Sequence, residues 1–366
     1  MRVLQIVDSL DMGGIQTFLL NLNSKIDQSK VAFDYLVFRP HEQVLEKEFI
    51  GIGAKVYKLP NWRKGPIKNR IAIRDFYREH SEYQIIHYHA GTLVDIGPLV
   101  EAKHAGICFR IMHSHNTHAA GGYYNTALHN IHKKSISTLA THYFACGDLA
   151  AKWMYGGTSV EDSVRIINNG IVTERYRYDS SVREKKRREL GLSNKLVIGH
   201  IGRFSPEKNQ SFLVDVMKTI HDENKNACLI FIGDGPEKSS VMEKVRSNEL
   251  KNCIQFLGIR KDVEQLLQAM DVFVMPSLFE GFPVVLVEAQ AAGLPCIISD
   301  SISSEVKINE NVVGLSLNES KQNWARAILE HGIRIETTTK LCESGFDIQN
   351  TANCLADFYK GLIYGV

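Results

Sequence analysis

Residues 271–300 read DVFVMPSLFEGFPVVLVEAQAAGLPCIISD, and this stretch decides the fold. The run 271–277 has the length and the apolar character of a buried strand, and the same character returns at 296–299. Pro283 stands where a helix can begin, because its missing N–H would lack a partner in the first turn anyway. The helix is expected to end at Gly293. The stretch therefore predicts a strand, loop, helix and strand of a parallel α/β sheet.

Two glutamates in this stretch are candidates for ligand binding. Glu280 lies in the expected loop, Glu288 lies in the expected helix, and Gly281 leaves backbone N–H groups exposed at the helix N-terminus. Such N–H groups favour phosphate, and carboxylates accept hydrogen bonds from sugar hydroxyls. The pattern fits an anionic ligand rich in hydroxyl groups. A helix cap at Glu280 and a solvated helix residue at Glu288 explain the two residues equally well.

The whole chain has 366 residues and a formal net charge of +2. This length favours two domains, and the nearly balanced charge gives no reason to expect a nucleic acid partner. The seven cysteines are scattered and form no CxxC pair, which is typical of reduced core residues in a cytosolic protein. No apolar run approaches the roughly 18 residues of a spanning helix, and no leader is expected. We therefore expect a cytoplasmic protein whose membrane contact, if any, is peripheral.

Runs typical of strands alternate with runs typical of helices along both halves of the chain. Strands are expected at 3–7, 33–38, 55–59, 84–88, 110–114, 142–145 and 164–168, and again at 196–202, 228–233, 254–257, 271–277 and 296–299. Helices are expected at 16–23, 67–80, 93–105, 123–139, 210–224, 237–248, 262–270, 284–292 and 351–364. This alternation is typical of parallel sheets that are covered on both faces.

A hydrophilic segment at 173–194 interrupts the alternation and contains the charged string 183–188. It is expected to be a connector that ends in a short surface helix. The sequence thus predicts an α/β protein of two Rossmann-like, doubly wound domains that face a central cleft, with ligands at the carboxyl ends of the strands. The expected domains are 1–170 and 171–350, and the terminal helix 351–366 is a candidate addition to the first.

The first strand of the second half is followed by GRFSPEKN, residues 202–209. Arg203 and Lys208 flank its Ser-Pro turn, and Asn209 is expected to cap the next helix. A guanidinium forks onto phosphate oxygens and an ammonium is a compact charge, so the two cations predict a diphosphate clamp. A solvated basic loop is the simpler explanation of this motif when it is taken alone.

Two glycine-containing turns offer backbone that a ligand can approach closely. GDGP at 233–236 fits a passing base or ribose, although the same residues also form common turns. Gly13 and Gly14 follow the first strand, where a ligand contact and an ordinary flexible turn are equally good explanations. Neither turn completes GxGxxG, and no Walker motif is present. Dinucleotide-dependent redox chemistry and P-loop hydrolysis therefore lose support.

Histidines cluster at His87, His89, His113, His115 and His118. Alternate spacing places His113 and His115 on one face at the end of a strand, so a metal site has to be weighed. We expect no metal, because acidic ligands are few nearby and HxHxxH matches no closed ligand set. His115 is expected to orient or hydrogen-bond a sugar hydroxyl, with His113 as the alternative if the strand register differs. Each of the other histidines is a candidate core residue.

Basic residues crowd one stretch of the first half, beside Trp62. They are Arg63, Lys64, Lys68, Arg70, Arg74 and Arg78. A solvated helix face explains them most simply. The alternative is docking onto an anionic membrane surface, with Trp62 at the level of the headgroups.

Taken together, these motifs resemble those of the retaining glycosyltransferases of family 4, whose fold is GT-B. The similarity runs over nearly the whole chain and is most specific in the second half. It is carried by the Gly13-Gly14 loop, the strand end at His115, Asn169-Gly170, GRFSPEKN, GDGP, FLG at 256–258 and, above all, EGFPVVLVE, in which Glu280 and Glu288 match the family's paired glutamates. Gln16 departs from the pattern, since an acidic residue is common there in relatives.

The resemblance implies transfer of a sugar from a nucleotide-sugar donor, with retention at the anomeric carbon and without a cofactor or an obligatory metal. The residues that it implies for the reaction are His115, Arg203, Lys208 and Glu280. Those that it implies for binding the donor are Gly14, Gly233, Ile259, Gly281, Phe282 and Glu288.

Each of these residues has an implied role. Arg203 and Lys208 would hold the donor diphosphate, because without a metal the developing charge has to be met by fixed cations. Glu288 would bind the ribose and Glu280 the donor sugar, since the nucleotide is a good leaving group that needs no protonation. The acceptor hydroxyl would attack on the donor's own face. The remaining groups would serve the sugar (the Gly281 and Phe282 amides), the base (the backbone near Gly233 and Ile259) and the acceptor (His115 and the Gly14 loop).

By analogy with members of the family that assemble polysaccharides, the expected function is transfer of a hexose or N-acetylhexosamine from a UDP-sugar. The expected acceptor is a saccharide, in particular a lipid-linked one, in capsular or exopolysaccharide assembly at the inner membrane face. No residue of this chain identifies the base unambiguously. The choice of uridine therefore rests on the donors that members of the family commonly use. The alternatives are a UDP-sugar epimerase of similar fold and an inactive partner protein that binds sugar nucleotides.

Overall fold

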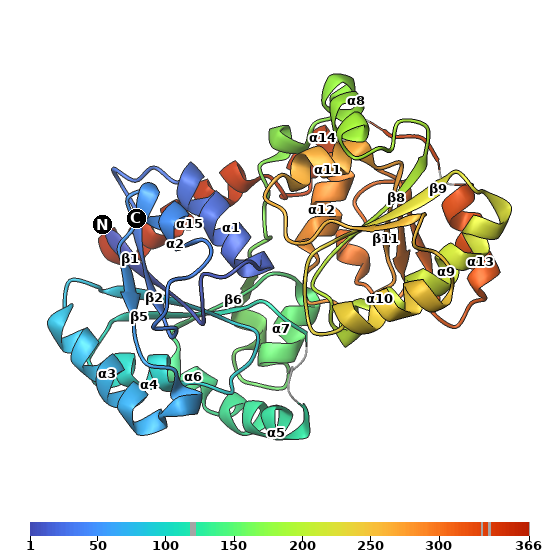
Figure 1. Ribbon diagram of the computed structural model, residues 1–366. Helices are drawn as coiled ribbons and strands as arrows, with labels where there is room; N and C mark the ends of the chain where they lie inside the picture. Colours follow the sequence, from blue (N-terminus) through green and yellow to red (C-terminus); the bar gives the residue numbers. More distant parts are fainter. Residues whose placement is uncertain (118–121, 331, 336–337, 366) are drawn as a thin grey trace. The chain divides into compact units, whose positions relative to one another are not determined.

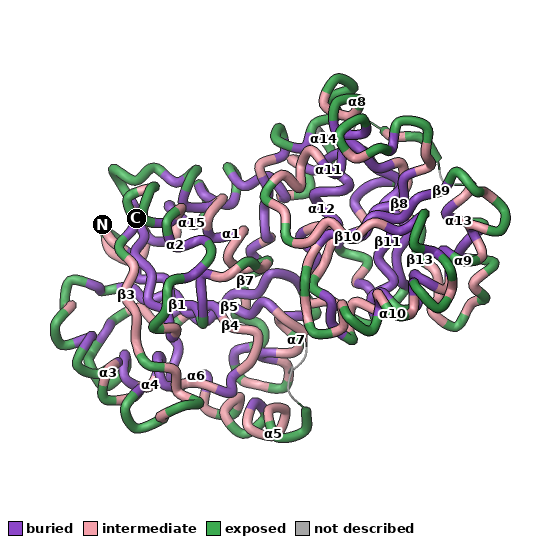
Figure 2. Tube along the Cα trace, in the orientation of Figure 1, coloured by how far each residue is buried: buried purple, intermediate pink, exposed green. Residues whose placement is uncertain are grey.

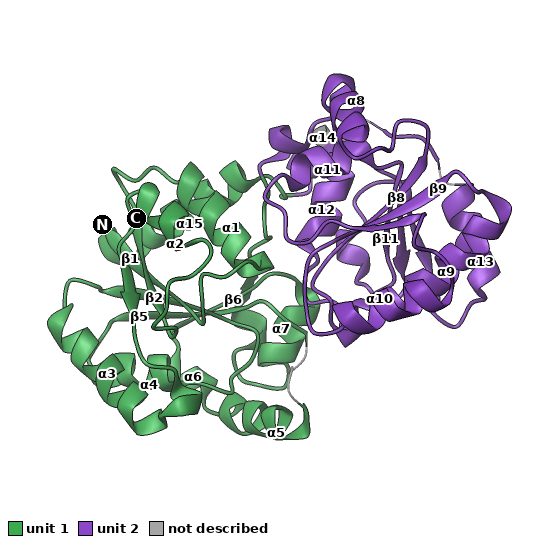
Figure 3. Ribbon diagram, viewed as in Figure 1, with its two compact units in different colours: residues 1–171, 345–366 green, residues 172–344 purple. Residues whose placement is uncertain are grey.

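The computed structural model (Figure 1) describes residues 1–117, 122–330, 332–335 and 338–365. The chain divides into two compact units (Figure 3), of which the first comprises residues 1–171 and 345–366 and the second residues 172–344. These divisions lie close to the expected ones at 170/171 and 350/351. Two α/β units, each built on a parallel sheet, confirm the expected fold class.

The chain returns to the first unit through a short parallel pairing. Ile171 forms a β-bridge with Asp347, and the Ile348 N–H donates to the Ile171 carbonyl across 2.9 Å. This pairing places residues 345–350 in the first unit, together with the terminal helix. The sequence places that short segment in the second domain, because it has no feature of its own that marks the crossing.

The sheet of the first unit is parallel, with strand order β3-β2-β1-β4-β5-β6-β7 within the described residues. Its strands are β1 (Arg2–Val7), β2 (Ala32–Val37), β3 (Val56–Lys58), β4 (Ile85–Ala90), β5 (Phe109–Ser114), β6 (His142–Ala145) and β7 (Val164–Ile166). The strand order reverses between β1 and β4, where Gln5 lies opposite His87. Ligands of such sheets bind at the carboxyl ends of the strands near this reversal.

Helices cover both faces of this sheet (Figure 1). One face carries α1 (Gly14–Lys25) and α15 (Ile348–Tyr364), and the other carries α3 (Pro66–Glu79), α4 (Gly97–His104) and α6 (Ile136–Leu139). The unit also contains α2 (Glu46–Gly51), α5 (Gly122–Lys133), α7 (Asp148–Tyr155) and the 3-10 turn η1 (Trp62–Lys64). The helix expected at 93–105 begins only at Gly97, whose N–H donates to the Asp95 carboxylate across 2.8 Å. The helix expected at 123–139 is two helices, α5 and α6.

The sheet of the second unit is also parallel, with order β10-β9-β8-β11-β12-β13 in the part of the chain that is described. Its strands are β8 (Leu196–Ile201), β9 (Ala227–Ile232), β10 (Ile254–Phe256), β11 (Val272–Met275), β12 (Cys296–Ser299) and β13 (Val312–Leu315). Figure 2 shows that the central strands are buried, in keeping with their apolar runs. The predicted strands do not include β13, a half-exposed edge strand whose apolar run is only VVGL.

The second unit has the same layered arrangement of helices. One face carries α9 (Gln210–Glu223), α10 (Lys238–Ser247) and α13 (Lys321–Leu329), and the other carries α8 (Ser180–Glu189), α11 (Val263–Ala269) and α12 (Val284–Ala291). The unit also contains α14 (Thr338–Glu343) and the 3-10 turns η3 (Thr173–Tyr176) and η4 (Pro206–Lys208). As expected, α12 follows Pro283 and ends before Gly293, which has a φ of +72°.

Helix α8 corrects the expectation of a plain surface helix in the connector. Its Lys186 and Arg187 are only 5% and 7% exposed. The Lys186 ammonium lies 2.9 Å from Asp262, and the Arg187 guanidinium lies 3.1 Å from Asp271. The charged string therefore has a buried side, because carboxylates at the starts of α11 and β11 lie opposite it.

No helix among the described residues has both the length and the apolar character needed to cross a membrane.

Candidate active site

The loops at one edge of the second sheet hold most of the residues expected to bind the donor. The strand order reverses between β8 and β11, which are neighbours in the sheet. The loop after β8 comprises residues 202–209, and the loop after β11 comprises residues 276–283. Since ligands of parallel α/β sheets bind where the order reverses, these two loops are the place to look for a donor site.

Lys208 and Glu280 form an ion pair that joins these two loops. The Lys208 ammonium lies 2.7 Å from each carboxylate oxygen of Glu280. The two side chains are only 18% and 9% exposed. The Leu278 N–H also donates to the Glu207 carbonyl across 2.8 Å, so the loops are held together along their backbones as well. Neither Lys208 nor Glu280 is therefore a solvated loop residue, and the N-cap position of α12 is Pro283.

Arg203 is placed differently from Lys208. Its side chain is exposed and has no hydrogen-bond or ion-pair partner among the described residues. The structure thus brings Lys208 to Glu280 but leaves the guanidinium of Arg203 in solvent. An arginine in this state is available to an anionic ligand without first breaking a contact within the protein.

Asn209 precedes α9 but does not cap it with its side chain, so that expectation is wrong. Its backbone is left-handed, with a φ of +54°, and its amide donates to the Pro276 carbonyl across 3.1 Å. The side chain is thereby turned away from the first turn of α9. Asn209 instead ties the loop after β8 to the loop after β11.

The glycines of the GDGP turn let its backbone lie close to the backbone of the loop after β8. A Cβ on Gly233, which has a φ of +131°, would lie 2.1 Å from the Gly202 carbonyl oxygen. The Gly233 N–H donates to the Gly258 carbonyl across 2.8 Å, and the Phe204 N–H donates to the Asp234 carbonyl across 3.0 Å. The turn therefore fixes the loop after β8 to its neighbours. Ile259, the next residue after Gly258, is 60% exposed.

Glu288 is a buried residue, which rules out the solvated helix position. It is 7% exposed, and its Oε1 accepts a hydrogen bond from the Tyr176 hydroxyl at 2.7 Å. Burial raises the pKa of Glu288, although the hydrogen bond from Tyr176 acts in the opposite direction. Gly281 and Phe282 lie half-buried in the loop just before α12. Tyr176 was missed because it lies in the hydrophilic connector, where no local pattern marks it.

His200 is a second residue of this edge that the sequence does not single out. It lies on β8, and its Nδ1 is 2.9 Å from the Val274 carbonyl oxygen, so this nitrogen carries the hydrogen. Its Nε2 is buried without a partner among the described residues. Burial, together with the nearby charge of Lys208, lowers the pKa of His200 to about 4, although the hydrogen bond to Val274 acts in the opposite direction. A neutral histidine thus lies beside the Lys208 ammonium.

In the first unit, the loop after β1 is held by hydrogen bonds from side chains. The Gln16 amide donates to the Ser9 carbonyl across 2.7 Å, and the Leu10 N–H donates to the Gln43 side chain. Gly13 precedes α1, Gly14 is its first residue, and a Cβ on Gly13 would lie 2.4 Å from the Gln16 amide oxygen. A carboxylate at position 16 has no hydrogen to donate to Ser9, which gives the departure from the family pattern a physical consequence.

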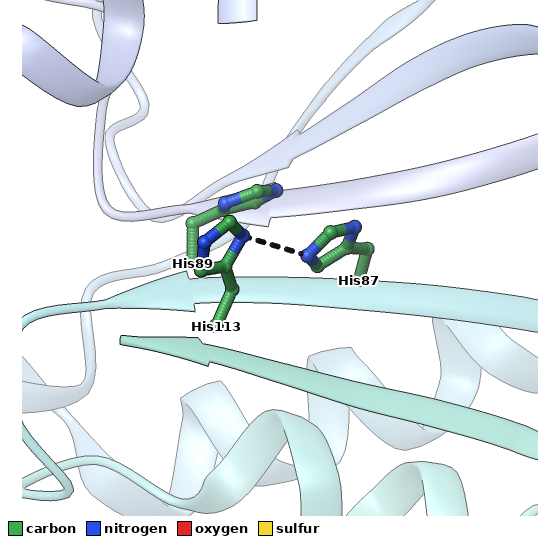
Figure 4. A group of neighbouring side chains, drawn as sticks. All are labelled: His87, His89 and His113. Carbon is green, nitrogen blue, oxygen red and sulfur yellow. Dashed lines mark hydrogen bonds between the residues drawn. The ribbon is translucent and has the colours of Figure 1, made fainter. Parts of the chain in front are cut away.

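The expected histidine cluster is present and buried. His87 and His89 lie on β4, His113 lies on β5, and His115 follows the end of β5. Figure 4 shows the first three rings close together, with a hydrogen bond of 3.1 Å between His87 and His113. His115 is 7% exposed and His113 is fully buried, so His115 is the one nearer the edge of the sheet. His118 lies outside the described residues.

The same cluster has the spacing of a candidate metal site. One nitrogen each from His87, His89 and His113 lies within 4.8 Å of the others. Burial lowers the pKa of all three well below the usual range, so they are neutral and able to act as ligands. However, the cluster offers no carboxylate to balance a buried dication, and both nitrogens of His87 and of His89 already have hydrogen-bond partners. The donor set therefore fits a metal poorly.

The basic stretch of the first unit is only partly a free basic surface. Arg70 and Arg74 both pair with Glu101, which is fully buried, with 3.0 Å between Arg74 and the carboxylate. These two arginines therefore belong to the contact between α3 and α4. Lys64 and Lys68 remain exposed. Next to them, the Arg63 guanidinium lies 5.4 Å from the Trp62 ring, and Ile67 is 75% exposed.

Known proteins resemble the chain, and one of them does so over nearly its whole length. A family model described as glycosyl transferases group 1 matches residues 182–331. The putative glycosyltransferase EpsF of Bacillus subtilis is 32% identical, with 98% of this chain and 96% of that protein covered. The UDP-Gal:alpha-D-GlcNAc-diphosphoundecaprenol alpha-1,3-galactosyltransferase of Escherichia coli is 28% identical over 55% of this chain and 54% of that protein.

A solved structure has the same architecture. HepE of Anabaena in complex with UDP-glucose superimposes with a TM-score of 0.75, covering 98% of this chain and 95% of that one. The sequence identity is 20%, so this likeness concerns the fold.

Proposed function

Since this chain belongs to the group 1 glycosyltransferases and has the GT-B fold, we propose that it transfers a hexose or N-acetylhexosamine from a UDP-sugar to a saccharide acceptor. The transfer retains the anomeric configuration and requires no metal. The observation that carries this proposal is the pair of Lys208 and Glu280, held side by side where the strand order of the second sheet reverses.

A sugar nucleotide has two parts that this pair can recognise. The ammonium of Lys208 attracts the diphosphate, and the carboxylate of Glu280 accepts hydrogen bonds from sugar hydroxyls. Arg203, which is exposed and unpaired among the described residues, adds a second cation. As the bond between the anomeric carbon and the diphosphate oxygen breaks, the two cations meet the negative charge that gathers on UDP. Fixed cations of this kind give the reaction a route that needs no metal.

The other expected donor contacts follow from the same edge. Glu288 binds the ribose hydroxyls through the carboxylate oxygen that does not accept from Tyr176. The Gly281 and Phe282 amides, just before α12, bind the sugar end. The backbone near Gly233 and Ile259 receives the base. In the first unit, His115 hydrogen-bonds a sugar hydroxyl, and the loop that ends at Gly14 serves the acceptor. Uridine is supported by the E. coli relative, which is named for UDP-Gal, and by the UDP-glucose bound in the Anabaena structure.

We further propose a lipid-linked acceptor and peripheral docking at an anionic membrane, as in assembly of capsular or exopolysaccharides. The E. coli relative is named for a diphosphoundecaprenol-linked acceptor. In this chain, the exposed lysines at 64 and 68 flank exposed Ile67, with Trp62 nearby. Basic and apolar side chains on one helix end are the combination that binds an anionic lipid surface.

A nucleotide and donor screen tests the proposal. Thermal-shift titration with UDP, GDP and ADP should give stabilisation by UDP, and stabilisation by GDP alone would refute the choice of base. A panel of UDP-sugars is then assayed for slow donor hydrolysis, which needs no acceptor, with and without EDTA. Lys208→Ala should abolish turnover, whereas Lys225→Ala, an exposed lysine of the same unit, should not. Interconversion of UDP-sugars would indicate an epimerase, and binding without turnover an inactive partner protein.

A further inference from the structure

Four buried histidines of the first unit form two hydrogen-bonded rows on one face of the sheet. In the first row, Gln5 Oε1 lies 2.7 Å from His89 Nε2, and His89 Nδ1 lies 2.8 Å from His115 Nε2. The row ends at His115 Nδ1, which is buried and has no hydrogen-bond partner among the described residues. Leaving a buried polar atom without a partner is unfavourable, so a ligand that supplies the missing hydrogen bond at this atom binds more tightly.

The second row runs parallel to the first. The Tyr359 hydroxyl of α15 lies 2.6 Å from His87 Nδ1, and His87 Nε2 lies 3.1 Å from His113 Nδ1. The Gln5 amide nitrogen lies 3.5 Å from the Tyr359 hydroxyl and joins the two rows at their start. Gln5 is therefore the common origin of both rows.

The Gln5 amide sets the direction of every hydrogen bond in the first row. Burial lowers the pKa of His115 to about 3 and that of His89 well below its usual value, so both rings are neutral. A neutral imidazole has one N–H and one bare nitrogen. Because the Gln5 carbonyl accepts, His89 carries its hydrogen on Nε2, and its bare Nδ1 accepts from the Nε2–H of His115. Nδ1 of His115 is then bare. If the Gln5 amide were turned round, so that its nitrogen faced His89, the direction of each hydrogen bond in the row would be reversed and Nδ1 of His115 would carry the hydrogen.

We propose that Gln5 and His89 are positioning residues that hold His115 in the tautomer with a bare Nδ1, so that this atom accepts a hydrogen bond from a sugar hydroxyl. The inference deepens the proposed function and rests on it, because that function places a sugar hydroxyl at His115. It also fixes the chemistry of the group that binds there, which has to be a hydrogen-bond donor. A carbonyl or an ether oxygen of a substrate would leave Nδ1 unpaired.

The experiment is nitrogen NMR of the full-length protein labelled with ¹⁵N-histidine, in which a bare and a protonated ring nitrogen have distinct shifts. His115→Gln identifies the His115 signals by their loss. In the wild type we expect a bare Nδ1 and a protonated Nε2 at His115. Gln5→Met, which keeps the length of the side chain but removes its amide, should give a mixture of both tautomers at His115.

Tyr359→Phe is the matched control, because it removes the hydroxyl at the start of the second row and, at Gln5, only the long 3.5 Å contact of the amide nitrogen, while the 2.7 Å contact between Gln5 Oε1 and His89 Nε2 is kept. It should change the signals of His87 and His113 and leave those of His115 unchanged. In activity assays, Gln5→Met should lower kcat about tenfold, the effect of losing one well-placed hydrogen bond, while the affinity for UDP is kept.

Three results would overturn the inference. These are a protonated Nδ1 at His115 in the wild type, a single unchanged tautomer in Gln5→Met, or a stoichiometric transition metal in the purified protein. Should Gln5→Met fail to fold, the wild-type and Tyr359→Phe spectra still decide between the tautomers. A bare Nδ1 in a protein without transferase activity would refute the proposed function and, with it, the role of His115 towards sugar, but not the tautomer itself.

Discussion

Tyr176 donates its hydroxyl hydrogen to Oε1 of Glu288 across 2.7 Å, and so ties the turn η3 to helix α12. Burial raises the pKa of Glu288 above its ordinary value of 4.5, although this hydrogen bond favours the charged form. An acid whose pKa is higher in the folded state than in the unfolded state holds its proton to a higher pH when folded. The free energy of unfolding therefore falls as the pH rises through the interval between the two pKa values.

Glu288→Gln should therefore be stable at pH 7 but defective in donor binding. The amide keeps an oxygen for Tyr176 and removes a buried charge, so the melting temperature should stay the same or rise. The affinity for the UDP-sugar should fall about tenfold or more, since a hydrogen bond to a charged group contributes roughly 1.5–3 kcal/mol. Thermal unfolding and calorimetric titration measure the two effects. A lower melting temperature with unchanged affinity would show that Glu288 is only structural.

A double-mutant cycle can separate the contributions of Lys208 and Glu280 to stability from their contributions to transfer. Lys208→Ala leaves a largely buried carboxylate without its ammonium and should lower the free energy of unfolding by about 1–3 kcal/mol. Adding Glu280→Gln should restore most of that stability, because the buried charge that lost its ammonium partner is removed as well. Transfer should stay abolished in both variants, as measured by release of UDP. Recovery of activity in the double variant would contradict the assigned roles.

Gly233→Ala should disturb the donor edge through the backbone. Its Cβ would lie 2.1 Å from the Gly202 carbonyl oxygen, at a φ of +131°. A loss of about 3 kcal/mol is expected, which lowers the melting temperature by roughly 6–12 °C and weakens UDP binding. Gly191→Ala is the control, since Gly191 also has a positive φ but its Cβ would meet no atom within 4 Å. Equal effects of the two substitutions would mean that the contact with Gly202 does not matter.

Asp271 should make the stability depend on pH at the acid end. Burial alone would raise its pKa, but the Val197 N–H and the Arg183 guanidinium hold the pKa below its ordinary value. A depressed pKa contributes stability that is present above the unfolded value, near 4, and is lost as the pH falls through the folded value. Asp271→Asn should lower the free energy of unfolding by about 3 kcal/mol at pH 7, because Arg187 stays buried.

The pH dependence of that difference is the test of the Asp271 prediction. The difference in the free energy of unfolding between wild type and Asp271→Asn should become smaller below about pH 4. Protonation of Asp271 then removes the negative charge in the wild type too. Asp222→Asn, from an exposed pair with Lys225, should change the stability little at any pH. A gap that stays constant down to pH 2 would exclude the carboxylate charge as its cause.

Docking on anionic lipid is tested by replacing the exposed lysines of the first unit. Lys64→Gln with Lys68→Gln should weaken sedimentation with phosphatidylserine vesicles about thirtyfold, at roughly 1 kcal/mol for each basic residue. The matched control is Lys225→Gln with Lys251→Gln, two exposed lysines of the second unit. Binding of the wild type should fall as salt is added. Equal binding by both double variants would show that Lys64 and Lys68 are ordinary solvent-exposed residues with no role in docking.

The alternating pattern of the sequence is enough for the architecture. Buried parallel strands appear as apolar runs, so β6 and β12 have the bounds that the sequence predicts, and Gly293 ends α12 as expected. A short apolar run does not always mark a strand clearly, and β13 at the edge of the second sheet (VVGL) is not among the predicted strands. The mixed string in α8 predicts a surface helix, because a charge pattern does not reveal the carboxylates that lie opposite it in the fold.

Residues 271–300 show the same division between sequence and tertiary structure. By itself, the sequence determined the strand, loop, helix and strand, and it marked Glu280 and Glu288 as the residues to follow. Only the tertiary structure decided their partners, which are Lys208, 72 positions away, and Tyr176, 112 positions away. The physical reason is that helix and strand patterns depend on near neighbours along the chain. An ion pair or a hydrogen bond instead needs two groups within about 3 Å. The pairing of β8 with β11 brings Lys208 to Glu280, and the packing of η3 against α12 brings Tyr176 to Glu288.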